Sequence, residues 1–190
     1  MMERCSWCGT DVQYVKYHDE EWGVPVHDDK KHFEFLVLES AQAGLSWLTI
    51  LKKRENYRIA YDDFDVIKVS NYDVIKYDEL LNNKGIVRNK LKITASINNA
   101  RHFLAIQKEF GSFDRYIWSF TNNIPVENKW DSISEIPATS ELADRVSADL
   151  KARGFKFLGP TIVYSHLQAT GLINDHITSC FRYKDNKQIK

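Results

Sequence analysis

The chain has 190 residues, of which 43% are hydrophobic, enough to build one domain or two small lobes on a shared core. Its 26 basic and 26 acidic residues balance to a net charge of zero, which argues weakly against DNA binding. Local charge decides the question, because phosphate contacts can be confined to one face. Because the N-terminus lacks an apolar signal region and no apolar run could span a bilayer, we expect a soluble, cytoplasmic protein with no membrane contact.

The first 28 residues are rich in aromatic side chains and contain two of the three cysteines, Cys5 and Cys8. An odd number of cysteines in an intracellular protein indicates metal ligation or free thiols rather than a disulfide framework. The segment ends at Pro25, and Asp28 or Asp29 can then cap the next helix.

Residues 33–51 predict one buried helix, around which we expect the rest of the chain to pack. Apolar residues cover nearly its whole circumference at helical spacing, and Glu39 lies in this apolar surface close to Trp47. A buried carboxylate costs several kcal/mol unless it is paired or neutralised. Glu39 is therefore either salt-bridged to a Lys or Arg elsewhere in the chain, or placed at the floor of a pocket.

The rest of the chain also reads as helical, and no segment shows convincing strand periodicity. Val74, Ile75 and Leu81 are expected to point inward from the first of the helices that follow, and a polar tail from about residue 182 is expected to be disordered. The predicted class is all-α, with helices at residues 71–81, 89–110, 113–121, 139–151 and 161–170 and a last helix ending near Cys180.

A glycine-containing connection between the helices at 139–151 and 161–170 resembles an anion site. Gly154 and Gly159 permit close backbone approach, and Pro160 suits the first turn of the next helix. The free N–H groups at that helix start can bind a phosphate, with Lys156 adding positive charge. An ordinary tight turn between two helices is the alternative interpretation.

A second basic cluster lies near the start of the 89–110 helix. It can contact a nucleic-acid backbone, or it can be a solvated helix start. Its members are Lys84, Arg88, Lys90 and Lys92.

Cysteines and histidines near the two chain ends form a potential metal site. Cys5 and His18 lie near the N-terminus, and His176 and Cys180, four residues apart, would share one helix face near the C-terminus. A Cys2His2 set suits a tetrahedral structural zinc. Cys8 can replace His18 in this set, and the two cysteines as a CxxC pair could also be a redox site, although no βαβ pattern accompanies them.

Several long motifs occur in an order that resembles the 3-methyladenine DNA glycosylase I family, of the helix-hairpin-helix DNA-repair superfamily. The resemblance spans nearly the whole chain, from Arg4 to Cys180. It rests on YHDEEWGVP at 17–25, QAGLSW at 42–47, KKRENY at 52–57, WSF at 118–120, GFKFLGPT at 154–161 and NDH at 174–176.

This resemblance implies a helix-hairpin-helix glycosylase fold over residues 1–190, as a single domain of two helical lobes, with the hairpin at about 152–163. It implies hydrolysis of the N-glycosidic bond of 3-methyladenine in alkylated double-stranded DNA by a monomeric protein, with free 3-methyladenine as product. It also implies a structural zinc clasp that joins the N- and C-terminal segments, with Cys5, His18, His176 and Cys180 as ligands.

The resemblance also assigns roles around the base. Glu39, Tyr17 and Trp47 match base-recognition residues, with Glu39 and Tyr17 expected to act in catalysis. Further pocket wall is expected from Tyr14, Trp22 and Ser165, and contact with the DNA backbone from Gly154, Lys156, Gly159 and Thr161.

These residue types suit the expected chemistry. A glycosylase flips its target nucleotide into a pocket with aromatic walls, and a purine methylated at N3 is cationic before cleavage. A carboxylate at Glu39 would favour that cation and accept a hydrogen bond from its exocyclic amine. The alkylated base leaves readily, so water is the expected nucleophile.

One position departs from the superfamily pattern. Asn174 stands where a catalytic Asp is usual, with Asp175 one residue away, and no Lys suits lyase chemistry at the hairpin. We therefore expect a monofunctional enzyme, an expectation that would be wrong if Asp175 reached the sugar. A zinc-containing module that binds DNA without cleaving it, and a thiol redox protein using Cys5 and Cys8, are the competing hypotheses.

Overall fold

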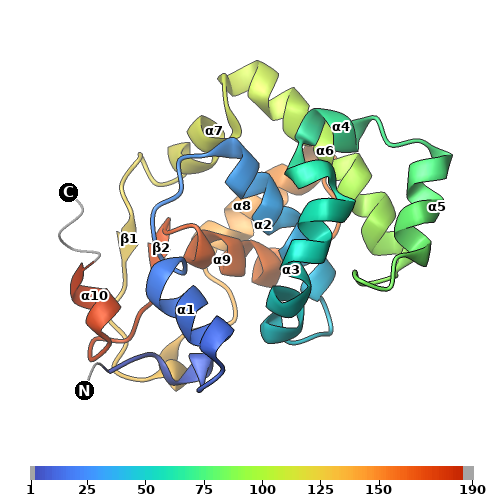
Figure 1. The fold of residues 1–190 in the computed structure, drawn as a ribbon. Helices are drawn as coiled ribbons and strands as arrows, with labels where there is room; N and C mark the ends of the chain where they lie inside the picture. Colours follow the sequence, from blue (N-terminus) through green and yellow to red (C-terminus); the bar gives the residue numbers. More distant parts are fainter. Residues whose placement is uncertain (1–2, 186–190) are drawn as a thin grey trace.

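The structure, a computed structural model, describes residues 3–185. The first and last described segments of the chain lie side by side (Figure 1). The Phe181 N–H donates a hydrogen bond to the Glu3 carbonyl at 3.0 Å. The helices are α1 (Val12–Glu20), α2 (Asp29–Gln42), α3 (Trp47–Ala60), α4 (Val66–Ser70), α5 (Val74–Asn82), α6 (Lys90–Phe110), α7 (Phe113–Ser119), α8 (Glu141–Ala152), α9 (Pro160–Ala169) and α10 (Phe181–Asp185), with 3-10 turns η1 (Ser6–Cys8), η2 (Asp62–Phe64) and η3 (Ile133–Glu135).

Helix α2 is the buried centre of the fold, as the sequence predicts for this segment. Every residue from His32 to Ala41 is buried, and α3, α6, α7 and α9 all contact the helix. Figure 1 shows α2 in the middle of the molecule, with α9 beside it. None of the helices in the described chain is both long and apolar enough to cross a membrane.

The predicted single helix over residues 33–51 is wrong, because α2 and α3 are separate helices. Gly44 has a φ of +80°, a conformation that glycine adopts at little cost, and it follows Ala43, the C-cap residue that ends α2. Ser46 then caps α3 by accepting from the Thr49 N–H at 3.2 Å. The break leaves Glu39 in the last turn of α2 and Trp47 in the first turn of α3.

Two details of the predicted helices differ in the first half of the chain. The long helix α6 matches its prediction closely, with Asn89 as its N-cap and Gly111 in the left-handed conformation at its end. In α5 the predicted inward orientation of Val74 and Ile75 is wrong, since both are exposed. They lie in its first turn, outside the face on which Leu80 is buried.

The predicted last helix, ending near Cys180, is also wrong. Gly171 ends α9 at a φ of +74°, and a Cβ there would lie 2.5 Å from the Pro25 nitrogen. The chain continues as the two-residue strand β2 (Ile173–Asn174), which pairs in parallel with β1 (Val126–Glu127). The expectation of no strands is wrong here, because a two-residue strand leaves no periodicity in the sequence. The mostly helical class is confirmed.

The predicted polar tail begins in an ordered element, because Arg182 lies in α10. Residues 186–190, on which the rest of that prediction falls, lie outside the described residues.

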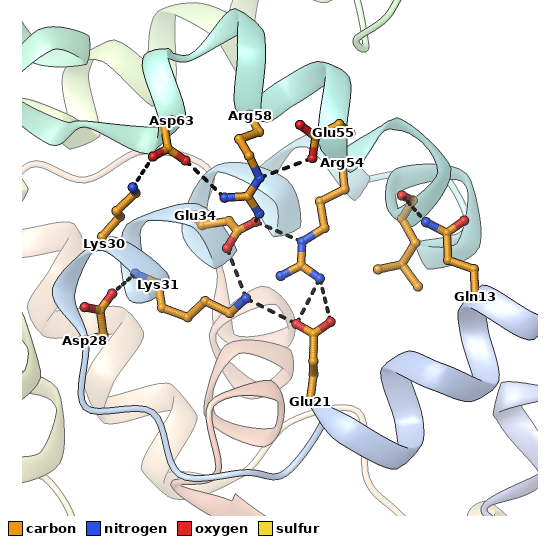
Figure 2. Close-up of polar contacts among 11 residues, drawn as sticks. Gln13, Glu21, Asp28, Lys30, Lys31, Glu34, Arg54, Glu55, Arg58 and Asp63 are labelled. Atoms are coloured by element: carbon orange, nitrogen blue, oxygen red, sulfur yellow. Dashed lines mark hydrogen bonds and ion pairs between the residues drawn. The ribbon is translucent and has the colours of Figure 1, made fainter.

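A network of ion pairs joins α2 to α3 around the buried Glu34 (Figure 2). Its carboxylate accepts from Arg54 Nε at 2.8 Å and Arg58 Nη2 at 2.9 Å, and it lies 3.2 Å from Lys31 Nζ. Arg54 also forms an ion pair with a second carboxylate, with its Nη1 2.9 Å from Glu21 Oε2. Burial opposes ionisation of Glu34, but the Arg54 hydrogen bond and the neighbouring cations outweigh it and lower its pKa.

We therefore predict that Glu34 makes stability depend on acid pH. Because folding lowers its pKa, its contribution is complete above the ordinary pKa of about 4.3 and is lost as the pH falls through the folded-state pKa. Glu34→Gln should reduce the free energy of unfolding at pH 7 by about 3 kcal/mol, because Arg54 loses its buried partner. Urea denaturation at pH 7 and at about pH 3 measures the free energy of unfolding. The exposed Glu55→Gln is the control. Equal losses of stability in the two variants would contradict the prediction.

Candidate active site

A cavity of about 300 Å³ opens between α1, α2, α3 and α9. The structure brings all six predicted base-contacting residues to its walls, and it adds others that the sequence did not single out. The cavity is lined by Trp7, Tyr14, Tyr17, Trp22, Glu39, Gln42, Trp47, Ile133, Ile136, Ser165, Gln168 and Ala169.

Helix caps place the aromatic walls of this cavity. Asp11 caps α1, whose residues Tyr14 and Tyr17 face the cavity three positions apart. The ring centroid of Tyr17 lies 5.5 Å from that of Trp47 at the start of α3. The ring of Trp7 packs 5.2 Å from Tyr14 at the other side. The cavity therefore offers aromatic walls against which a flat, apolar ring can pack.

Glu39 lines the cavity and has one unpaired carboxyl oxygen. Its side chain is 3% exposed; Oε2 lies 2.9 Å from His166 Nδ1, whereas Oε1 is buried with no partner in residues 3–185. The alternative that Glu39 pairs with a Lys or Arg is wrong, because its hydrogen-bond partner is His166. Burial raises the pKa of Glu39 well above its ordinary value, which favours the neutral acid over the expected carboxylate.

Two further polar groups at the cavity are available to a bound molecule. The Trp47 Nε1–H is buried and has no acceptor among the described residues. Burial, with a smaller effect of Glu39, raises the pKa of Tyr17 well above its ordinary value, so its hydroxyl keeps its proton. The site combines an acceptor from Glu39 with donors from Trp47 and Tyr17.

A second site lies behind this cavity, where the two chain ends meet. The ligand atoms of Cys5, His18, His176 and Cys180 all lie within 4.8 Å of one another, and all four residues are buried. His176 and Cys180 approach each other from a loop, so their predicted shared helix face is wrong although the pair meets as expected. Cys8 lies outside the group and directs its thiol to the Cys5 carbonyl at 3.2 Å.

The spacing within this group, which we call the Cys2His2 cluster, fits a tetrahedral ion. The Sγ atoms of Cys5 and Cys180 each lie 3.6 Å from His176 Nδ1, and Cys180 Sγ lies 3.5 Å from His18 Nε2. Zinc–sulfur and zinc–nitrogen bonds at tetrahedral angles would separate such atoms by about 3.6 Å. The cluster can therefore hold a metal ion.

The remaining ring nitrogens of the two histidines are also held. His18 Nδ1 lies 2.8 Å from an Asp19 carboxylate oxygen, and His176 Nε2 lies 3.1 Å from the Trp22 carbonyl oxygen. Such outer contacts fix the tautomer and ring orientation of histidine ligands. The Cys5 thiol, through its hydrogen bond, lowers the pKa of Cys180, which favours a thiolate there.

Asn174 and Asp175, which lie at or beside the position where the resemblance leads one to expect a catalytic aspartate, both make contacts with other parts of the protein. Asp175 is fully buried and accepts four hydrogen bonds, from Asn128, Trp130, Tyr164 and Gln168. The Asn174 side chain donates to Glu127 at 2.9 Å. Neither lines the cavity, so Asp175 is not placed to reach a sugar there.

The connection from α8 to α9 exposes the start of α9. Gly154 has a φ of +98°, and a Cβ there would lie 2.6 Å from the His102 ring, whereas a Cβ at Gly159 would meet nothing. Gly159 gives α9 no side-chain cap, in contrast to the capped helices α1 to α8. Lys156 and Thr161 are exposed beside this helix start.

The second basic cluster divides into bound and exposed members. Lys92 Nζ donates to the carbonyls of Ala41 at 2.9 Å and Ala43 at 2.6 Å, so it holds the end of α2. Lys84, Arg88 and Lys90 are exposed.

Comparison with known proteins identifies the family. The methyladenine glycosylase family model matches residues 7–183. This chain belongs to the methyladenine glycosylase family. It is 47% identical to DNA-3-methyladenine glycosylase 1 of Escherichia coli strain K12, over 98% of this chain and 100% of the relative. It is 41% identical to DNA-3-methyladenine glycosylase of Haemophilus influenzae, over 95% of this chain and 97% of the relative.

A solved structure agrees with this membership. The structure of 3-methyladenine DNA glycosylase I from Staphylococcus aureus, described as the basis of its 3-methyladenine recognition, matches with a TM-score of 0.91 at 40% identity, over 95% of this chain and 96% of that one.

Of the residues at this site that sequence reasoning missed, two have the closest bearing on its geometry. His166 lies against Glu39, and Trp7 forms part of the cavity wall. The signal for His166 was available, since it is a polar residue in the apolar run of α9 and resembles Glu39 in this respect. Trp7 has no such signal, because its position depends on the path of the chain around the Cys2His2 cluster.

Proposed function

We propose that this family member hydrolyses the N-glycosidic bond of 3-methyladenine in alkylated double-stranded DNA, as the first step of base excision repair. The observation that carries the proposal is the aromatic cavity with the unpaired, buried Glu39 Oε1 at its wall. The relatives named as DNA-3-methyladenine glycosylases support the substrate.

The cavity suits a base that has been flipped out of the duplex. Stacking on aromatic walls contributes about 1–3 kcal/mol per base, and a cationic purine adds attraction to the ring faces of Trp47 and Tyr17. Glu39 Oε1 accepts from the exocyclic amine, and the Tyr17 hydroxyl donates to the base edge. Tyr14, Trp22 and Ser165 complete the wall.

The reaction needs little help at the sugar. Alkylation makes the base a good leaving group, and Asp175 is committed to four hydrogen bonds away from the cavity. The protein contributes flipping, stacking and recognition of the departing base, and water is the nucleophile. This is a monofunctional glycosylase, without lyase chemistry.

The α8–α9 connection contacts the DNA backbone as a helix-hairpin-helix motif. The uncapped start of α9 offers free N–H groups at the positive end of the helix dipole, and Gly159 leaves open space in front of them. Gly154, Lys156 and Thr161 belong to the same contact.

The Cys2His2 cluster holds a structural zinc ion. Its two thiol and two imidazole ligands suit zinc, and their spacing fits tetrahedral coordination. The ion would join the N- and C-terminal segments, and no step of the reaction passes through it. We further propose that the chain acts as a monomeric single domain of two helical lobes.

Base release tests the function directly. Incubated with methylated DNA, the protein should free 3-methyladenine but not 7-methylguanine, measured by chromatography of the released purines. Glu39→Leu should slow release about tenfold or more, because the amine loses its acceptor, whereas the exposed Glu55→Leu should not. DNA binding without release from the unchanged protein would favour a non-catalytic binding module.

Gly159→Val tests the backbone contact. The new side chain points into open space, so folding should be preserved while the approach of a phosphate is blocked. We expect affinity for duplex DNA to fall about tenfold and affinity for free 3-methyladenine to stay the same. Fluorescence titrations measure both, with the exposed Thr94→Val as control. Equal losses for both ligands would contradict the contact.

Metal analysis tests the zinc. We expect about one equivalent of zinc in the purified protein, and removal by a chelator should lower the melting temperature by about 10 °C or more. Cys180→Ser should lose the metal, and Cys8→Ser should keep it. Less than about half an equivalent, with a melting temperature insensitive to chelation, would rule the clasp out.

A further inference from the structure

Two buried histidines continue the hydrogen bonding of Glu39 away from the cavity. His166 Nδ1 lies 2.9 Å from Glu39 Oε2, and His166 Nε2 lies 3.3 Å from His32 Nδ1. His32 Nε2 lies 3.2 Å from the carbonyl oxygen of Val26. The three side chains are each no more than 3% exposed. The proposed recognition of the base uses neither histidine, so the pair His166 and His32 needs an explanation of its own.

With both imidazoles neutral, the contacts of the four groups fix where their protons lie. A carbonyl oxygen only accepts, so His32 Nε2 carries a hydrogen directed at Val26. A neutral His32 then accepts at Nδ1, and the hydrogen of that contact belongs to His166 Nε2. A neutral His166 in turn accepts at Nδ1. The proton between His166 and Glu39 therefore lies on Glu39 Oε2.

Burial supports these neutral forms. Desolvation lowers the pKa of His166 to about 3 and raises that of Glu39 well above its ordinary value. Desolvation also lowers the pKa of His32, although Asp114 opposes it. The neutral acid and two neutral imidazoles avoid the cost of burying a charge pair.

Few other titratable groups face the three side chains of Glu39, His166 and His32. Asp114 Oδ1 is 3.8 Å from His32 Nε2 and is itself held by the exposed His27 at 2.9 Å. The titratable groups that interact electrostatically with Glu39 or His32 come from three helices: Tyr17 of α1, Asp29 of α2 and Asp114 of α7.

We infer that His166 and His32 are positioning residues that keep the Glu39 proton on Oε2 and so present Oε1 to the cavity as an acceptor only. This inference rests on the proposed function and deepens it. An acceptor-only oxygen takes the 6-amino group of an adenine-type base, but it meets lone pairs at the 6-carbonyl of a guanine-type base. The pair therefore selects 3-methyladenine over 3-methylguanine.

Glu39→Gln tests the neutral state. A glutamine amide can donate through Nε2 to the bare His166 Nδ1 and leave its carbonyl oxygen facing the cavity, as the neutral acid does. We expect release of 3-methyladenine within about threefold of the unchanged protein. A loss of more than about a hundredfold in a folded variant would mean that Glu39 acts as an anion, and would overturn the inference.

His166→Phe tests the positioning. Without a partner on Oε2 the carboxyl group can direct its O–H toward the cavity and donate to a guanine-type carbonyl. The ratio of 3-methyladenine to 3-methylguanine release from one methylated DNA sample should fall about tenfold. His166→Asn, whose Oδ1 can accept in place of Nδ1, should restore much of the ratio. The exposed Glu55→Gln is the control and should leave the ratio unchanged.

Nitrogen NMR of the histidine-labelled protein tests the inference without any activity assay. His166 and His32 should each show one protonated nitrogen, Nε2, and one bare nitrogen, Nδ1, from pH 5.5 to 8. Two protonated nitrogens on His166 would place the proton off Glu39 and overturn the inference, as would an unchanged release ratio in a folded His166→Phe. If no base were released at all, the proposed function would fail while the NMR result still decided the protonation.

Discussion

The cost of burying carboxyl groups in α2 is the constraint on which the rest of the site depends. Glu34 and Glu39 lie on the same central helix and are almost equally buried, at 3% exposure each. Three cations surround Glu34 and lower its pKa, whereas among the described residues Glu39 has one polar side-chain partner, His166, and burial raises the pKa of Glu39. The first carboxylate joins two helices. The second is favoured in its neutral form by burial and has one carboxyl oxygen without a partner in the described chain.

The cavity and the Cys2His2 cluster are parts of one structure. Tyr17 faces the cavity, and the next residue, His18, faces the cluster. The Trp22 ring lines the cavity while its carbonyl oxygen lies 3.1 Å from His176 Nε2. An ion that ties the chain ends together would therefore also fix two aromatic walls of the base pocket.

Part of the site could be predicted from residues that break local rules, whereas the aromatic wall residues were predicted only from the family resemblance. Glu39 is a carboxyl group in an apolar helix, and the cysteines and histidines have metal-ligand spacing. The break after α2 was missed because one glycine and one serine interrupt an otherwise continuous apolar pattern. The β1–β2 pairing and the loop carrying His176 were missed because they depend on contacts between distant segments, which leave no periodicity.

Helix α9 connects the proposed DNA contact to the chemistry of the base. Its first residues follow Gly159 at the exposed end, Ser165 lines the cavity and His166 contacts Glu39. A helix is stiff along its axis, so a phosphate bound at its start is held at a nearly fixed distance from the base pocket. His32 and Glu39, on α2, are likewise joined to α9 through His166. Backbone binding and base recognition therefore share two packed helices, and a shift of either would disturb both.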